Sequence, residues 1–169
     1  IEAFYLIRNN NINCTVHAGE GYGPESIHKA IHYCGAHRIG HCTRLREDGD
    51  LLNYVADRRI PLEICLTSNV QTGTVKSIED HPFQLYFDYS LRVTLNTDNR
   101  LMSNTTVTDE YLLAAETFNL SMKDLKNIVI QGFRSSFLSY RDRVGLLREA
   151  LDPESPSPRY SRGSGNERN

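Results

Sequence analysis

Short apolar runs rich in β-branched residues recur through the first hundred residues of the chain. Four of these runs are predicted to be β-strands, and they lie at residues 12–16, 38–42, 61–66 and 92–95. Segments with the apolar spacing of amphipathic helices separate them. The regular alternation of strand and helix favours a parallel sheet with right-handed crossovers, which is an α/β fold.

The predicted helices differ in how clearly the sequence marks their ends. Those between the strands lie at residues 24–34, 48–58 and 82–89, and residues 1–10 are predicted to be the end of another helix. Pro24 begins the first of them and Gly35 is predicted to end it. Three more helices are predicted after the fourth strand. The first runs to about residue 118, the second begins at residue 121, and the third covers residues 141–151. Thr108 is expected to cap the first of these three, and Ser121 with Asp124 forms a capping-box pattern for the second.

The number of strands limits the architecture. A (β/α)8 barrel needs eight strands and typically about 250 residues, whereas this chain has 169 residues and four predicted strands. The chain is therefore either a small open α/β domain or half of a barrel. The folded unit is predicted to cover residues 1–152, and residues 153–169, rich in proline, serine and glycine, are predicted to be a disordered tail.

Charge and composition exclude several classes of partner. The formal net charge is -2 with both signs interspersed, so neither nucleic acid nor an anionic membrane is an expected partner. The mean hydropathy of -0.47 and the absence of a long apolar run argue against a transmembrane segment. The four cysteines form no close pair along the chain, which favours reduced thiols in a cytoplasmic protein.

Titratable side chains follow the predicted strands at their carboxyl ends. His17 and Glu20 follow the first strand, His41 the second and Asp98 the fourth. Any one of them has an ordinary explanation, such as a buried histidine or a carboxylate near a helix N-terminus. Together they supply imidazole and carboxylate ligands and proton carriers at the edge where parallel sheets bind ligands, which points to metal-assisted hydrolysis.

The remaining histidines and one buried carboxylate have separate interpretations. His28, His32 and His37 lie on or just after a predicted helix and are expected to be solvated or to serve packing, and His81 is expected to be structural. Glu63 lies inside an otherwise apolar strand. We expect it to orient His41 or a metal ligand from behind.

The order of four motifs carries a family resemblance. They are TVHAGE at residues 15–20, RIGH at 38–41, EICLTSN at 63–69 and LNTD at 95–98. In this order and at this spacing they resemble the adenosine deaminase family over residues 11–140. The resemblance implies the C-terminal half of a (β/α)8 barrel of the metal-dependent amidohydrolase type. The implied reaction is hydrolytic deamination of adenosine, and possibly deoxyadenosine, to inosine and ammonia by a zinc-activated water in purine salvage.

The resemblance also implies a role for each matching residue. His17 resembles a zinc-binding histidine and Asp98 a zinc-binding carboxylate. Glu20 resembles the carboxylic acid that hands a proton to purine N1, and His41 the imidazole that orients or deprotonates the water. Asn99 stands where many members of the family have a second aspartate facing purine N7. Because an asparagine amide is an unambiguous donor, Asn99 is compatible with a purine ligand.

A second departure concerns the metal. The His-x-His pair that supplies two zinc ligands in the family does not occur in this sequence, and two ligands are too few for a catalytic Zn²⁺ site. We therefore expect the chain to be a fragment that is inactive without the N-terminal half of the barrel. Two alternatives remain open from the sequence: a deaminase of another 6-aminopurine, such as adenine or AMP, and a non-catalytic half-barrel that serves as a binding module.

Overall fold

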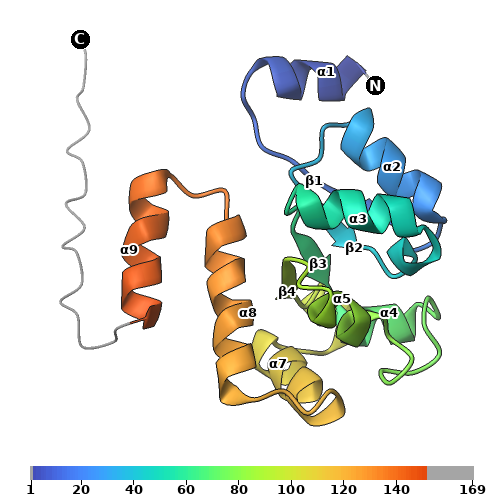
Figure 1. The fold of residues 1–169 in the computed structure, drawn as a ribbon, viewed down its shortest axis with the longest axis vertical. Helices are drawn as coiled ribbons and strands as arrows, with labels where there is room; N and C mark the ends of the chain where they lie inside the picture. Colours follow the sequence, from blue (N-terminus) through green and yellow to red (C-terminus); the bar gives the residue numbers. More distant parts are fainter. Residues whose placement is uncertain (1, 152–169) are drawn as a thin grey trace.

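The computed structural model describes residues 2–151, so the predicted disordered tail at 153–169 lies outside the described residues (Figure 1). The strands are β1 (Thr15–Ala18), β2 (Arg38–His41), β3 (Leu62–Ile64) and β4 (Val93–Leu95). The helices are α1 (Glu2–Asn9), α2 (Pro24–His32), α3 (Gly49–Asp57), α4 (Leu66–Gln71), α5 (Phe83–Asp88), α6 (Arg100–Ser103), α7 (Val107–Thr117), α8 (Met122–Ser135) and α9 (Tyr140–Leu151), with a 3₁₀ turn at Leu45–Glu47.

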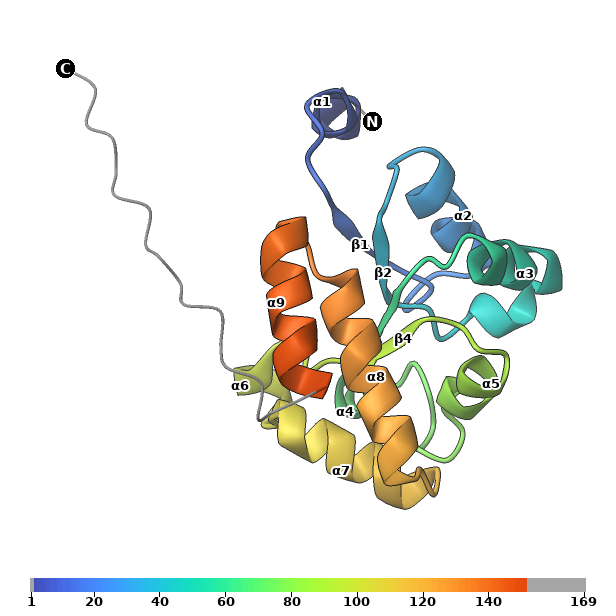
Figure 2. The ribbon, with the colours of Figure 1, turned by 60° about the vertical axis from the view of Figure 1, so that its left-hand side comes forward.

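The four strands form one parallel sheet in the order β1-β2-β3-β4. Each strand is followed by at least one helix before the next strand begins, and this confirms the predicted α/β alternation. Neither β1 nor β4 has a second neighbouring strand among residues 2–151, so the sheet is open at both sides. Helix α8 packs beside β4 and α9 packs along α8 (Figure 2).

The register arranges the side chains of the sheet in alternating rows. Val16, Ile39, Leu62 and Val93 form an apolar row, and His17, Gly40, Glu63 and Thr94 form the next row toward the carboxyl ends. Because successive residues of a strand point to opposite faces, the two rows lie on opposite faces of the sheet. The apolar row joins the core beneath the helices. The polar row lies on the face where the candidate chemistry is found.

Several element boundaries differ from the sequence-based expectation. The first strand lies at Thr15–Ala18 rather than at 12–16, and the third stops at Ile64 because residues 66–71 turn into α4, which was not predicted. Helix α2 ends at His32, and Gly35, with φ +68°, lies in the turn that follows. The predicted Ser121–Asp124 capping box at the start of α8 is confirmed.

The cap of α7 was assigned to the wrong threonine. Thr106, not Thr108, is the N-cap, and it forms a capping box with Asp109. A capping box pairs the N-cap residue with the residue three positions later. That spacing joins Thr106 to an acidic side chain, whereas three positions after Thr108 stands Tyr111, which cannot reciprocate.

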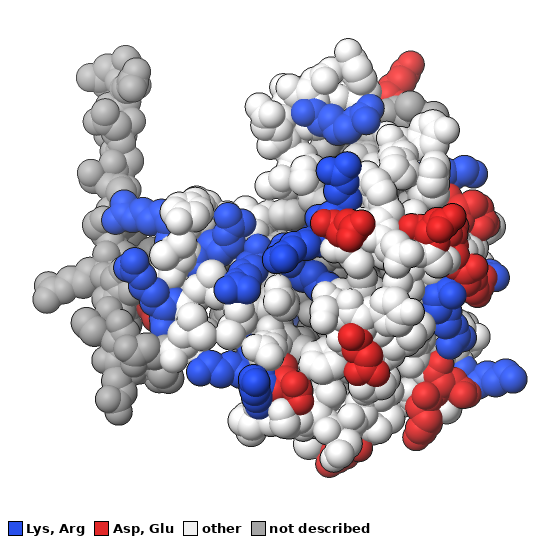
Figure 3. Space-filling model, viewed as in Figure 1, with Lys and Arg blue, Asp and Glu red and all other residues white. Residues whose placement is uncertain are grey.

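The surface carries charges of both signs, and the face in Figure 3 shows basic side chains gathered across its middle. None of the helices among residues 2–151 has the length and the apolar character that crossing a membrane requires. The four cysteines are all free thiols.

Candidate active site

His17 lies in the polar row of the sheet, and the residue beside it on β2 is Gly40. A Cβ atom at Gly40 would lie 3.2 Å from Cδ2 of His17. That separation is shorter than ordinary van der Waals contact, so a larger residue would press against the imidazole. The glycine therefore leaves the space that the His17 ring occupies.

His41 is the last residue of β2 and is almost completely buried. Its φ of 113° is rare for a residue with a side chain and takes it out of the alternation of the strand. The ring consequently reaches the other histidine, with Nε2 of His41 3.0 Å from Nδ1 of His17. Burial lowers the pKa of His41 below its ordinary value, although the negative charge of Glu20 opposes that shift.

Glu20 reaches the same cluster from the loop after β1. Its Oε1 lies 3.8 Å from Nδ1 of His41 and 3.5 Å from Nδ2 of Asn69, and its side chain is one-quarter exposed. The turn that delivers it needs Gly19, which has φ +68° and whose Cβ would lie 2.5 Å from a methyl carbon of Ile27. A glycine at this point thus fixes how Glu20 approaches His41.

Asp98 follows β4 and also has a left-handed backbone, with φ 54°. Its Oδ2 accepts a hydrogen bond of 2.8 Å from the Ser68 hydroxyl on α4. Asp98 and His17 line one hollow of about 280 Å³ at the carboxyl ends of the strands, together with His41, Glu63 and other residues. The structure therefore brings side chains from all four strand ends to one place.

These side chains form a donor set that fits Zn²⁺. His17, Glu20 and His41 offer ligand atoms within 4.8 Å of one another, whereas the sequence assigned the metal to His17 and Asp98. The two sets share His17. Asn69 binds both Glu20 and His41, whereas one oxygen of Asp98 is held by Ser68 and the other has no hydrogen-bond partner among the described residues. Imidazole nitrogen and carboxylate oxygen are ordinary zinc ligands.

A family model described as adenosine deaminase matches residues 1–153. The chain belongs to the adenosine deaminase family. The curated adenosine deaminase of Mycobacteroides abscessus is 43% identical over 164 residues, covering 90% of this chain and 45% of that protein. The chain thus spans less than half the length of this relative.

Solved structures of deaminases have the same fold over this region. The adenine deaminase of Arthrobacter aurescens matches with a TM-score of 0.85 at 25% identity, covering 89% of this chain and 46% of that chain. The N6-methyl-AMP deaminase of Arabidopsis thaliana matches with a TM-score of 0.81 at 28% identity, covering 93% of this chain and 45% of that chain. These are (β/α)8-barrel deaminases, so the four-stranded sheet is confirmed as a half-barrel arrangement.

The position of Asn99 is compatible with the role that the family resemblance implies. Its side-chain oxygen accepts hydrogen bonds from the backbone N–H groups of Leu101 and Met102, which makes Asn99 the N-cap of α6. The amide orientation is thereby fixed, and its NH₂ group makes no hydrogen bond among the described residues. Asn99 is exposed and lies next to Asp98.

The partner assigned to Glu63 was wrong. Its carboxylate accepts a hydrogen bond from the Thr15 hydroxyl and pairs with Arg38, whose Nε lies 3.0 Å from Oε1 without an aligned hydrogen bond. It lines the hollow but makes no hydrogen bond to His17 or His41 in the part of the chain that the structure describes. Asn69 holds His41 instead, with Nδ2 3.2 Å from its Nδ1.

Sequence reasoning assigned no role to Ser68 and Asn69, which lie on the unpredicted helix α4. Both bind residues of the site: Ser68 is hydrogen-bonded to Asp98, and Asn69 contacts His41 and Glu20. A polar run directly after a buried strand was the available signal. Its meaning depended on α4, which turns two neighbouring polar side chains back toward the sheet.

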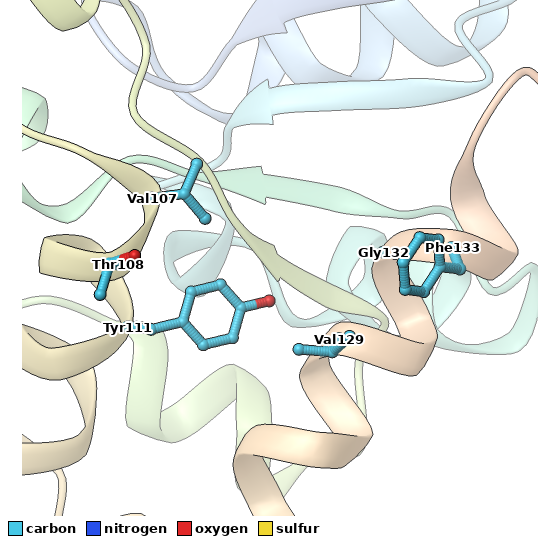
Figure 4. Close-up of a pocket in the computed structure, with 6 residues that line it drawn as sticks. All are labelled: Val107, Thr108, Tyr111, Val129, Gly132 and Phe133. Atoms are coloured by element: carbon cyan, nitrogen blue, oxygen red, sulfur yellow. The ribbon is translucent and has the colours of Figure 1, made fainter. Parts of the chain in front are cut away.

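Two other hollows among residues 2–151 lack the combination of imidazole and carboxylate groups found at the strand ends. The hollow between α7 and α8 is larger, about 520 Å³, and is lined by Val107, Thr108, Tyr111, Val129, Gly132 and Phe133 (Figure 4). Its one titratable group is Tyr111, whose pKa is raised by burial. A hollow at the amino ends of the strands contains His37 and several arginines but no carboxylate. Size therefore does not identify the active site in this chain.

Proposed function

We propose that this chain supplies the C-terminal half of a zinc-dependent adenosine deaminase active site, which converts adenosine to inosine and ammonia. The observation that carries the proposal is the convergence of His17, Glu20 and His41 within 4.8 Å, with Asp98 lining the same hollow as His17. Membership of the adenosine deaminase family supports this reaction over other hydrolyses.

The division of labour follows from the side chains. His17 and Asp98 would hold Zn²⁺, which when bound lowers the pKa of water and so makes a nucleophile available near neutral pH. Glu20 would carry a proton to N1 of the purine, because attack at C6 places electron density on the ring. His41 would hold the attacking water in line from the buried side of the pocket. Asn99 would donate its NH₂ group to purine N7.

Two ligands from this chain do not complete a catalytic zinc site, which ordinarily has three protein ligands. The sheet also has two open sides, and His17 is exposed. We therefore propose that residues equivalent to the other half of the relatives complete the metal site and cover this face. The complete unit would bind a small purine nucleoside.

The second candidate is deamination of a different 6-aminopurine. The two solved structures compared above are those of an adenine deaminase, at 25% identity, and an N6-methyl-AMP deaminase, at 28% identity. All three substrates share the purine ring that Glu20 and Asn99 would contact. They differ in the sugar and phosphate, which these residues do not recognise.

The test is a substrate panel with the longest natural polypeptide that contains this sequence. Ammonia release is measured from adenosine, deoxyadenosine, adenine, AMP and N6-methyl-AMP, with zinc content determined on the same sample. We expect adenosine to have the highest kcat/KM and one zinc ion to be bound per active site. A preference for adenine or a nucleotide would replace the substrate assignment, and no ammonia release from any of them would overturn the proposal.

A Glu20→Gln variant connects the activity to this chain. Glutamine keeps the size of the side chain but cannot transfer a proton, so kcat should fall by about 10²–10⁴-fold. Glu25→Gln is the matched control, because Glu25 is exposed on α2 and is outside the cluster. An unchanged kcat in Glu20→Gln would exclude proton transfer by Glu20.

A further inference from the structure

A chain of buried polar side chains runs from the active site into the protein. Nδ1 of His41 lies 3.2 Å from Nδ2 of Asn69, and Oδ1 of Asn69 lies 3.2 Å from Nε2 of His81. His41, Asn69 and His81 are each at most 3% exposed. Buried polar groups at these distances are hydrogen-bonded, so each contact has one donor and one acceptor.

The donor and acceptor of each hydrogen bond between His41, Asn69 and His81 follow from one backbone group. The backbone N–H of Phe83 lies 3.0 Å from Nδ1 of His81 and can only donate. Nδ1 of His81 must therefore accept, and the ring proton of a neutral His81 must be on Nε2. Burial lowers the pKa of His81 to about 3, with Arg46 and His41 as smaller causes, so the ring is neutral under ordinary conditions.

The proton on Nε2 of His81 sets the orientation of Asn69. Because His81 donates, the atom of Asn69 that faces it must be the carbonyl oxygen, and the NH₂ group must face the active site. That group has two hydrogens and two acceptors nearby, Nδ1 of His41 at 3.2 Å and Oε1 of Glu20 at 3.5 Å. The separation of 3.8 Å between Glu20 and Nδ1 of His41 is too long for a direct hydrogen bond.

We infer that His81 and Asn69 are positioning residues that fix the tautomer of His41 and the direction of Glu20. Nδ1 of His41 accepts from Asn69, so the proton of the neutral ring is on Nε2, the atom that faces His17. The Nε2–H of His41 then donates to Nδ1 of His17 in this structure, and a neutral ring that carries its proton on Nε2 cannot remove a proton with that atom. This inference rests on the proposed function for its catalytic consequence but not for its geometry.

Two substitutions of His81 separate this role from a merely structural one. Glutamine can place an amide nitrogen near the position of Nε2 and so keep the donor to Asn69, whereas asparagine can accept from Phe83 but does not reach Asn69. In the longest natural polypeptide that carries this sequence, we expect His81→Asn to lower kcat about tenfold or more with KM within about twofold. His81→Gln should recover most of that loss.

The control pair is His28→Gln and His28→Asn, on the exposed surface of α2, and neither should change kcat. Melting temperatures are measured for all four variants. If both His81 variants lose the same amount of kcat, and this loss parallels the decrease in their melting temperatures, His81 is only structural and the inference is wrong. If neither variant loses kcat, the inference is also wrong.

The tautomers can be measured without any assay of activity. Nitrogen-15 NMR of histidine-labelled protein should place the ring proton of His81 on Nε2, and that of His41 on Nε2 as well. In Asn69→Asp the carboxylate can only accept, so the proton of His41 should move to Nδ1. Detection of the His81 proton on Nδ1 would overturn the inference even if deamination is demonstrated. Absence of deamination with the expected tautomers would instead count against the proposed function alone.

Discussion

At the scale of single residues, the site depends on backbone positions as much as on reactive groups. His41 and Asp98 both have positive φ, which costs on the order of 1–3 kcal/mol for a residue with a side chain. Such strain persists only where surrounding contacts hold it. Here Asn69 holds His41 and Ser68 holds Asp98, so the side chains that aim the chemistry also stabilise its unusual backbone.

Gly40 gives a residue-scale prediction. In Gly40→Ala the new methyl group would lie 3.2 Å from Cδ2 of His17 and would displace the imidazole. We expect zinc affinity to fall by about tenfold or more, the range found when support of a metal ligand is lost. Gly49→Ala is the control, because a Cβ there meets no atom within 4 Å. Equal zinc affinity in the two variants by competition with a chelator would contradict the placement of His17.

Asn99 gives a second prediction at this scale. Asn99→Leu loses both the NH₂ donor and the cap of α6, whereas Asn99→Ser keeps a capping hydroxyl and loses only the donor. We expect KM for the purine to rise by roughly three- to tenfold in both variants, as for one lost hydrogen bond. Thermal stability should fall only in Asn99→Leu. An unchanged KM in Asn99→Ser would remove Asn99 from substrate binding.

At the scale of elements, Tyr86 ties α5 to the loop that follows His41. Its hydroxyl donates to the carbonyl oxygen of Cys42 at 2.6 Å and accepts from the backbone N–H of Arg46 at 3.0 Å. The ring is completely buried in the core. One phenol thus fixes the chain directly after β2.

Removing that hydroxyl should be costly. Tyr86→Phe keeps the ring but removes the acceptor of the Arg46 backbone N–H and one of the two hydrogen bonds that the Cys42 carbonyl oxygen accepts, so the free energy of unfolding should fall by about 1–3 kcal/mol. Tyr89→Phe, at an exposed position on the same segment, should change it by less than about 0.5 kcal/mol. Denaturant unfolding of the two variants checks this. Equal stability of the two variants would mean that the backbone groups of Cys42 and Arg46 do not depend on the Tyr86 hydroxyl.

The titration of His81 belongs to the same scale because it joins α4 to the segment before α5. Its pKa is about 3 in the folded chain and about 6.5 when unfolded, so between these values the unfolded chain binds more protons. Stability from this group is complete above pH 6.5 and is lost as the pH falls, by roughly 3 kcal/mol at pH 4.5. The stability difference between wild type and His81→Gln should shrink over this range. A difference that does not change with pH would show that folding does not lower the pKa of His81.

The sequence predicted the parallel strands and the convergence of His17, Glu20, His41 and Asp98, because strand periodicity and strand-end chemistry are local patterns. It did not predict α4, because a six-residue helix after a buried strand has no periodicity of its own. The buried carboxylate of Glu110, from α7, accepts the backbone N–H of Thr67 at 3.3 Å and helps to hold the first turn of α4. That contact spans 43 residues and has no local signature.

The same reason explains why the sequence assigned Glu63 to the wrong partner and named no partner for His81. Glu63 is a carboxylate inside an apolar strand, so the sequence indicates that it needs a partner without saying which, whereas His81 precedes a proline in a loop and its burial has no local signal. The register places Glu63 near Arg38, and the fold places His81 beside Asn69. Partner choice across the sheet depends on tertiary geometry, so it could be read only from the structure.

At the scale of the whole molecule, the chain presents a site on the open face of a half-barrel sheet. The helices cover the other face, where the core lies. Family membership and the match to about 45% of each relative's length agree with this arrangement. We therefore propose that this chain supplies proton transfer and part of the metal site, and that residues equivalent to the other half of the relatives supply the rest of the metal site.

The most direct test of this account is the location of zinc in a crystal of the longest natural polypeptide that contains this sequence, from anomalous diffraction at the zinc edge. The account predicts one strong peak with a His17 ring nitrogen and an Asp98 carboxylate oxygen at about 2.0–2.2 Å. A peak bound by other residues, with His17 and Asp98 both outside its coordination sphere, would contradict it.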